Sequence, residues 1–183
     1  MRVKPLFICI AVIFSATVSV KSQDTANGAD LTIRSGIIFN AEPLIRGGNF
    51  KPGLYFAAYT LWNINPYIKI GPEIGVFSIS LEDYFPVGCR IHSYFIKKGT
   101  SLFLSNSLGY ALSNRLGVGG LDWGGVFVKT GLGVSSGLTD RLRIVFNLEY
   151  YLQERKQRSF LSAVLDSEMQ HFISVSGGLS FKL

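Results

Sequence analysis

Alternation of apolar and polar residues is the dominant pattern along this chain. It is clearest in Arg141–Leu152, whose sequence is RLRIVFNLEYYL. One parity is entirely apolar, while the other carries two arginines, an asparagine and a glutamate. Because a β-strand directs alternate side chains to opposite faces, the segment predicts a strand with one apolar and one largely polar face. A tilted strand of about 9–11 residues crosses a bilayer, and this segment is long enough to do so.

The same alternation predicts eight strands: Asp30–Asn40, Leu54–Asn63, Tyr67–Leu81, Pro86–Ile96, Thr100–Leu112, Trp123–Ser135, Arg141–Leu152 and Met169–Lys182. Three links are tight turns: Asn65-Pro66, Lys97-Lys98-Gly99 and Ser136–Asp140. Most of the others are longer: Ala41–Gly53, Ser113–Asp122 and Gln153–Glu168, with Glu82–Phe85 as a short exception. Short periplasmic turns and long outer loops are typical of outer-membrane barrels. The predicted fold class is therefore all-β, an eight-stranded antiparallel up-and-down transmembrane barrel with both termini at the short-turn end.

Parity also assigns side chains to faces. Apolar residues of the seventh strand are predicted to face lipid: Leu142, Ile144, Phe146 and Leu148. Polar residues of several strands are predicted to form an interior network: Arg34, Lys69, Glu73, Arg90, His92, Lys129, Arg143, Asn147 and Glu149. Since buried charges must be paired, Glu73 and Glu149 are interpreted as ion-pair partners rather than acid/base catalysts. The candidate partners of Glu149 are Lys129, Arg34 and Arg90.

Some features of the strands are less regular. The second strand is apolar on both parities, so its faces stay ambiguous. Pro72 removes a ladder donor from the third strand and predicts a local bulge. Aromatic residues near strand ends predict interfacial rims, because amphipathic rings favour the boundary between hydrocarbon and headgroups. The predicted rim residues are Trp62, Tyr67, Tyr110, Trp123, Tyr150 and Phe181, with Tyr84 and Phe85 also near the outer ends.

Composition and the N-terminal segment add a location. Charged residues make up only 16% of the chain, against a usual share of about 25%. A basic start followed by the apolar run Pro5–Val18 predicts a secretory signal peptide, residues 1–22, cleaved near Ser22. A periplasmic lead-in, 23–29, and a barrel domain, 30–183, follow. Removing 1–22 takes away three cations and no acid, so the formal charge falls from +6 to +3. The remaining cations are spread along the strands, which does not predict nucleic-acid binding.

Four segments together resemble a known family: Phe85–Phe95 (FPVGCRIHSYF), Leu108–Leu112 (LGYAL), Val128–Val134 (VKTGLGV) and Gly177–Leu183 (GGLSFKL). They look like the small outer-membrane β-barrel domains of Bacteroidota-type Gram-negative bacteria, and the resemblance covers nearly all of 30–183. It implies localisation in the bacterial outer membrane, contact with its lipid and lipopolysaccharide, and insertion by the outer-membrane assembly machinery. Barrels of that family usually end in an aromatic residue, whereas here Lys182 and Leu183 follow Phe181. The resemblance implies no single biochemical role.

The sequence predicts no catalytic, metal or cofactor site. His92 and Ser93 are adjacent on a strand, so they face opposite sides and cannot act as a nucleophile and base pair. His171 falls on the apolar parity near the outer rim. Cys89 is the only cysteine after the signal peptide, and two isolated histidines do not have metal-ligand spacing. Gly131-Leu-Gly133 is not followed by a helix, so it does not predict a phosphate-binding loop.

The predicted function is non-enzymatic: a structural or surface-binding barrel whose outer loops, Ala41–Gly53, Ser113–Gly120 and Gln153–Glu168, meet partners. Arg155, Lys156 and Arg158 are candidates for binding lipopolysaccharide or an unknown extracellular ligand, although a merely solvated loop explains them equally well. Three alternatives stay open. One is a lipid-modifying hydrolase, which would need a Ser/His/acid cluster at a rim. Another is a small pore, and the last is a soluble ligand-binding barrel with every face inverted.

Overall fold

The structure is a computed structural model that describes residues 28–42, 51–79, 82–115, 121–158 and 165–183. The predicted signal peptide, 1–22, and nearly all of the lead-in, 23–29, lie outside these residues. So do most of the predicted loop Ala41–Gly53 and the central part of Ser113–Asp122. Within the described residues, no helix is both long and apolar enough to cross a membrane.

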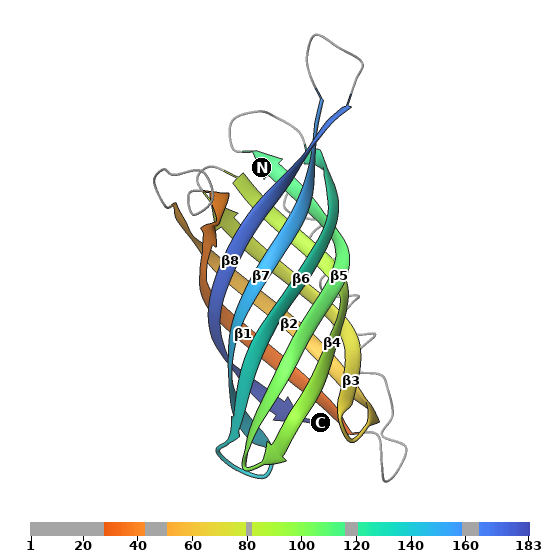
Figure 1. Ribbon diagram of the computed structural model, residues 1–183, viewed down its shortest axis with the longest axis vertical. Helices are drawn as coiled ribbons and strands as arrows, with labels where there is room; N and C mark the ends of the chain where they lie inside the picture. Colours follow the sequence, from red (N-terminus) through yellow and green to blue (C-terminus); the bar gives the residue numbers. More distant parts are fainter. Residues whose placement is uncertain (1–27, 43–50, 80–81, 116–120, 159–164) are drawn as a thin grey trace.

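Eight antiparallel strands form a closed barrel in which strand order follows sequence order (Figure 1). The first strand closes the barrel by pairing with the last, from Asp30↔Lys182 to Asn40↔Phe172. The predicted fold class is confirmed. The strands are β1 (Ala29–Asn40), β2 (Pro52–Asn65), β3 (Ile68–Ile79), β4 (Glu82–Lys98), β5 (Thr100–Arg115), β6 (Leu121–Gly137), β7 (Leu142–Arg158) and β8 (Leu165–Lys182).

Three short turns lie at the end of the barrel that also holds both ends of the described chain (Figure 1). In the β2–β3 turn, the Asn65 side-chain oxygen accepts the backbone N–H groups of Tyr67 and Ile68, each at 2.8 Å. Gly99, between β4 and β5, has a φ of 63°, which glycine adopts without steric cost. In the β6–β7 turn, the Thr139 hydroxyl accepts the backbone N–H of Leu142 at 3.0 Å. Asn65, Gly99 and Thr139 therefore stabilise tight turns at this end of the barrel, which we call the turn end.

The strands extend further at the opposite end than the alternation predicts. Glu82–Phe85 belongs to β4, and most of Gln153–Glu168 belongs to β7 and β8, so the prediction of loops there is wrong. The β7–β8 ladder continues from Gln153↔Gln170 to Arg158↔Leu165. These residues are mostly polar, and backbone pairing in a hairpin does not need an apolar face. The two strands form a ribbon that projects beyond the rest of the barrel (Figure 1).

The predicted bulge at Pro72 is also wrong. The β2–β3 register is the same on both sides of Pro72, at Tyr59↔Glu73 and at Trp62↔Ile70, so no residue is inserted. The ladder simply lacks the two intervening pairs. Irregularities of register occur instead at Asn63/Asn65, Tyr94/Ile96 and Ala111/Ser113. The missing N–H of Pro72 is thus accommodated by omitting ladder pairs rather than by adding a residue.

Apolar side chains cover the outside of the barrel. In β7, Phe146 is 61% exposed and Leu148 is 54% exposed, while Leu142 and Ile144 on the same parity are half-buried. The ambiguity of β2 is resolved, because Tyr55, Tyr59 and Leu61 are buried whereas Leu54 and Phe56 are exposed. Polar residues occupy the interior. This distribution is the reverse of a water-soluble barrel and suits a barrel surrounded by lipid.

Four of the six predicted rim residues, Tyr67, Tyr110, Tyr150 and Phe181, are exposed on the outside, and Trp62 is half-buried. The side chain of Trp123 lies outside the described set. Tyr84 lies near the outer end of β4, as predicted, but it is 1% exposed and packs inside the barrel instead of at the rim. Its inward direction follows from parity with Arg90, which an assignment based on distance from the strand end overlooks.

Candidate functional site

Five charged side chains meet in the middle of the barrel. Glu73 of β3 and Glu149 of β7 face Arg34 of β1, Arg90 of β4 and Lys129 of β6, and each is at most 2% exposed. Alternation along five different strands directs them inward, and closure of the barrel brings them together. All five belong to the predicted interior set, and we call them the central ion network.

Glu73 is bound by all three cations of the network. Its Oε1 atom accepts Lys129 Nζ at 2.7 Å, Arg34 Nη2 at 2.9 Å and Arg90 Nη1 at 3.1 Å. Its Oε2 atom accepts the Ser107 hydroxyl at 2.7 Å. Burying a carboxylate away from water is tolerable only with such compensation. Glu73 is therefore the central carboxylate of the network, a role that the sequence did not single out.

Glu149 is bound by both arginines. Its Oε2 atom accepts Arg34 Nη1 at 2.7 Å, and its Oε1 atom accepts Arg90 Nη2 and, at 3.1 Å, the Ser105 hydroxyl. Two of its three candidate partners are thus its ion-pair partners, whereas Lys129 pairs with Glu73. Because each guanidinium contacts both carboxylates, the arginines link the two sides of the barrel.

The network has three cations and two carboxylates, and aromatic rings offset part of the excess positive charge. The Arg90 guanidinium lies 4.6 Å from the ring centre of Tyr59, and the Arg34 guanidinium lies 5.0 Å from that of Tyr55. The Tyr55 hydroxyl also accepts Arg34 Nη2 at 2.6 Å. Such cation–π contacts are attractive when desolvated.

An aromatic layer fills the lumen on the side of the network away from the turn end. Phe77 stacks on Tyr84 at 4.7 Å between ring centres, and Phe127 stacks on Tyr151 at 5.4 Å. Phe172 contacts Phe77 edge to face at 5.4 Å. These five residues, the aromatic layer, were missed as interior residues. The signal was available, because each shares the inward parity of a charged residue on its own strand or a paired strand.

A smaller apolar layer closes the lumen on the turn-end side of the network. His92 stacks on Phe103 at 4.2 Å, and Tyr94 packs against Phe103 at 5.3 Å. Val145 belongs to the same buried cluster. His92 Nε2 accepts Arg90 Nε at 2.7 Å, so the histidine joins this layer to the central ion network. Stacked rings and ion pairs thus fill the barrel in three consecutive layers.

The remaining predicted interior residues lie apart from the network. Lys69 forms an ion pair with Asp30 near the turn end. Arg143 is half-buried, and its Nη2 atom lies 3.5 Å from the Ser101 hydroxyl oxygen. Asn147 is buried, and neither atom of its side-chain amide has a hydrogen-bond partner. The predicted interior set is therefore divided between a central cluster and the turn-end mouth.

The described residues offer little for nucleophilic or metal chemistry. His92 is buried in the lumen, where its Nε2 atom accepts a hydrogen bond from Arg90 and its ring stacks on Phe103. Ser93 lies on the opposite face of the strand. His171 is on the outside, where its Nδ1 atom lies 2.5 Å from the Tyr150 hydroxyl oxygen. No group of three or more metal-ligating side chains occurs in the described part of the chain.

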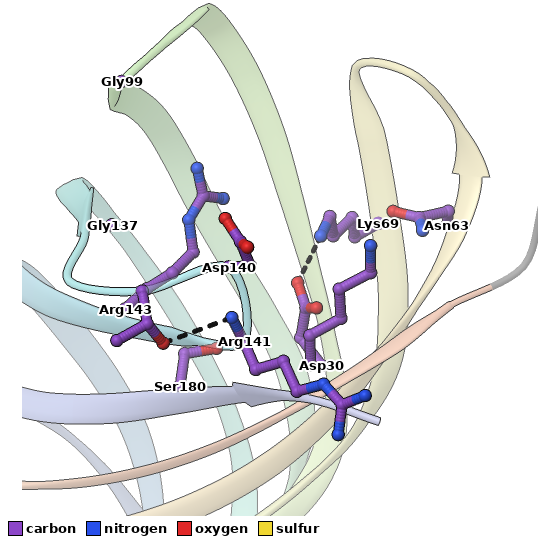
Figure 2. Close-up of a pocket in the computed structure, with 11 residues that line it drawn as sticks. Asp30, Asn63, Lys69, Gly99, Gly137, Asp140, Arg141, Arg143 and Ser180 are labelled. Carbon is purple, nitrogen blue, oxygen red and sulfur yellow. Dashed lines mark hydrogen bonds and ion pairs between the residues drawn. The ribbon is translucent and has the colours of Figure 1, made fainter.

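A cavity of about 460 Å³ opens at the turn end of the barrel (Figure 2). The starts of β1, β3 and β7, the ends of β2, β6 and β8, and the β4–β5 and β6–β7 turns surround it. The residues that line it are Asp30, Asn63, Lys69, Gly99, Gly137, Thr139, Asp140, Arg141, Arg143, Ser180 and Lys182. Figure 2 shows Lys69 directed toward Asp30, with Arg143 and Asp140 on the β6–β7 side of the mouth.

Known proteins resemble this chain in structure but not in sequence. No family model matches the sequence, and no curated protein matches it. The crystal structure of Neisserial surface protein A (NspA) superposes with a TM-score of 0.64 at 10% identity, covering 88% of this chain and 100% of that one. The chain has the fold of a small outer-membrane β-barrel. The N-terminal barrel domain of Pseudomonas aeruginosa OprF gives a TM-score of 0.59 at 9% identity, covering 85% and 99%. At these identities, the likeness shows the fold alone.

Proposed function

We propose that the protein is an integral barrel of a bacterial outer membrane, in a Gram-negative cell of the Bacteroidota type, exported through a cleaved signal peptide, 1–22. Its role is non-enzymatic, either structural or surface-binding through the outer end. The apolar outer face supports the membrane setting, because residues such as Phe146 and Val175 would otherwise expose large rings and branched chains to water. The fold shared with small outer-membrane barrels supports it too.

The filled lumen is the observation that carries the proposal. Eight strands enclose an interior just wide enough for side chains to fill. Here Glu73 and Glu149 are held by three cations, with aromatic rings packed on both sides. A solute would have to break several buried ion pairs to pass. This arrangement favours a scaffold over the alternative of a small pore.

Side-chain contacts at the end opposite the turns hold the base of the projecting β7–β8 ribbon. Arg155 of β7 donates to Glu82 of β4 at 2.6 Å, and the Tyr84 hydroxyl donates to Glu82 at 2.5 Å. The Tyr84 hydroxyl also lies 2.9 Å from the side-chain oxygen of Gln170 in β8. These contacts connect the base of the β7–β8 ribbon to the neighbouring strands. The ribbon is therefore the best-supported candidate for surface binding, and its basic residues suit lipopolysaccharide phosphates.

The hydrolase alternative has weaker support. It needs a serine and a histidine within hydrogen-bond reach at a rim. Among the described residues, His171 is the rim histidine, and its contact is with Tyr150 rather than with a serine. No specific observation favours hydrolysis over a non-enzymatic role.

Binding of lipopolysaccharide to the purified barrel tests the surface-binding role. Lys156→Gln combined with Arg158→Gln removes two positive charges from the ribbon. The matched control, Lys97→Gln combined with Lys98→Gln, removes two from the turn end. We expect the ribbon variant to weaken binding several-fold and the control to leave it unchanged. Equal binding by wild type and the ribbon variant would contradict recognition through the ribbon.

A further inference from the structure

The turn-end cavity carries more positive than negative charge. It is lined by four cations, Lys69, Arg141, Arg143 and Lys182, and by two carboxylates, Asp30 and Asp140. Lys69 is neutralised by its ion pair with Asp30. Among the described residues, no ion pair involves Arg141, Arg143 or Lys182, and with Asp140 as the second carboxylate the lining keeps an excess of two positive charges for a ligand.

These three cations are held on ordered backbone. The Thr139 hydroxyl accepts the backbone N–H groups of Arg141 and Leu142 at 3.3 and 3.0 Å, which fixes the turn that carries Arg141. The backbone N–H of Lys182 donates to the Arg141 carbonyl at 2.8 Å. Arg143 follows within the paired part of β7, opposite Gly137 and Ser180. Because the backbone is already ordered, binding here costs less conformational entropy than binding to a free loop.

The cavity narrows toward its inner end. A space of only about 10 Å³ continues from it, lined by the apolar layer of Tyr94, Phe103 and Val145 and by Asp30, Arg143 and Ser180, which also line the cavity. A small anion entering from the mouth can reach the half-buried Arg143, whereas the space beyond it, about 10 Å³, is too small for a phosphate. A volume of about 460 Å³ lies within the range of small-molecule sites. The cavity therefore has the size of a small-molecule binding site and does not continue as a wide channel.

The polar groups between the cations suit a phosphate. The Ser180 hydroxyl, which lines the cavity, is held in place by its hydrogen bond with the Thr32 hydroxyl at 2.9 Å. Arginine forks and lysine ammonium groups both bind phosphate oxygens. A tetrahedral phosphate presents oxygens in several directions, which matches cations carried by the β6–β7 turn, β7 and the end of β8. A single planar carboxylate would satisfy one fork and leave the other cations unused.

We propose that this cavity binds a phosphate-bearing ligand at the turn end of the barrel, with Arg141, Arg143 and Lys182 as the phosphate-binding residues. The site is distinct from the β7–β8 ribbon at the other end. In the proposed membrane orientation it opens to the periplasm. The phosphate belongs either to a soluble phosphorylated compound or to a phospholipid headgroup at the rim. Both sources share the chemistry that the cavity recognises.

Calorimetric titration of the full barrel in a neutral detergent at low salt tests this proposal. Glycerol 3-phosphate represents the soluble source, and a short-chain phosphatidylglycerol below its micelle concentration represents the lipid. We expect at least one of them to bind to wild type, and the tighter binder identifies the source. Failure of both to bind at millimolar concentration would overturn the proposal, as would equally tight binding of malonate, a dicarboxylate.

Variants locate the binding. Lys182→Gln and Arg143→Gln should each weaken binding by about tenfold or more, because each removes a charged hydrogen bond to the ligand. Arg143→Lys should recover part of the affinity if Arg143→Gln folds poorly. The control is Lys51→Gln, which removes an equal charge from an exposed position at the opposite end. Equal losses in Lys51→Gln and Lys182→Gln would show a nonspecific charge effect and overturn the site. Neither variant touches the ribbon, so the result is independent of lipopolysaccharide binding.

Discussion

Arg90 of β4 and Glu149 of β7 form an ion pair across the barrel, although 59 positions separate them in the chain. The two strands are not neighbours, because β5 and β6 lie between them. The pair therefore spans the lumen instead of lying along its wall. With Glu73 bound to the same guanidinium at 3.1 Å, it forms a lateral connection inside the barrel. This connection has consequences for both stability and conduction.

Removing the central carboxylate should strongly destabilise the barrel. Glu73→Gln leaves Arg34, Arg90 and Lys129 with Glu149 as the one carboxylate of the network, and breaking a buried pair costs about 3–5 kcal/mol. Asp30→Asn is the matched control, because it breaks a single ion pair at the mouth, with side chains 8% and 16% exposed, rather than several pairs in the interior, and it should cost less than Glu73→Gln. Urea unfolding in lipid vesicles, followed by tryptophan fluorescence, measures both. Equal losses would mean that the network contributes no more than the single pair at the mouth.

An arginine introduced on the outer face should lower the free energy of unfolding only where the strand lies in the hydrocarbon region of the membrane. Phe146 lies in the part of β7 that pairs with both β6 and β8 and is 61% exposed, so Phe146→Arg should lower the free energy of unfolding by about 2–4 kcal/mol. Leu138→Arg places the same side chain in the exposed β6–β7 turn and should have little effect. The unfolding free energies of both variants in vesicles provide the comparison. A Phe146→Arg variant as stable as wild type, or a wild-type monomer soluble without detergent, would contradict the lipid-facing assignment.

Replacing glycine by alanine should change the stability of the barrel differently at Gly131 and at Gly177. A Cβ at Gly131 would lie 2.3 Å from the Leu148 carbonyl oxygen and 2.7 Å from Glu149 Cγ. Gly131→Ala should therefore displace the network carboxylate and cost about 1–3 kcal/mol. A Cβ at Gly177 would meet the exposed Phe146 ring at 3.3 Å, and that ring can shift. Gly177→Ala should be nearly neutral in the same unfolding measurement. The reverse order would place Gly177, not Gly131, against the rigid interior.

Protease treatment of intact cells tests the orientation. The described pairs of β6 with β7 end at Phe127↔Gln153, whereas the β7–β8 ladder continues to Arg158↔Leu165, and such a two-stranded ribbon opens more easily than a closed sheet. Trypsin should cut next to Arg155, Lys156 or Arg158 and spare the turn end. Cleavage at Lys97 or Lys98 in intact cells, with the ribbon untouched, would invert the topology.

The sequence predicted the architecture well because alternation carries it directly. A period of two assigns every side chain of a strand to a face, so Arg34, Glu73 and Glu149 could be placed inside the barrel without coordinates. The strand number and the short turns followed from turn residues such as Asn65 and Gly99. The predicted outer ends of the last two strands were wrong because β7 and β8 continue with polar residues, for which alternation gives no signal.

The pairing inside the lumen could not be predicted from one sequence. Which charges meet depends on the stagger of the strands around the barrel, and stagger is set by register and closure. Parity made Lys129, Arg34 and Arg90 equivalent candidates for Glu149, and the structure assigns Lys129 to Glu73. The basic cavity was missed for the same reason, because Arg143 and Lys182 come together only when β8 closes on β7 and β1.

Single-channel recording in planar bilayers tests the filled lumen most directly. Wild-type protein should show little or no steady conductance, because the ion network and the ring layers on both sides of it occupy the lumen. Glu149→Ala removes the carboxylate that pairs with Arg34 and Arg90, so brief openings should become more frequent. A large and stable wild-type conductance that Glu149→Ala leaves unchanged would contradict the account and identify the protein as a small pore.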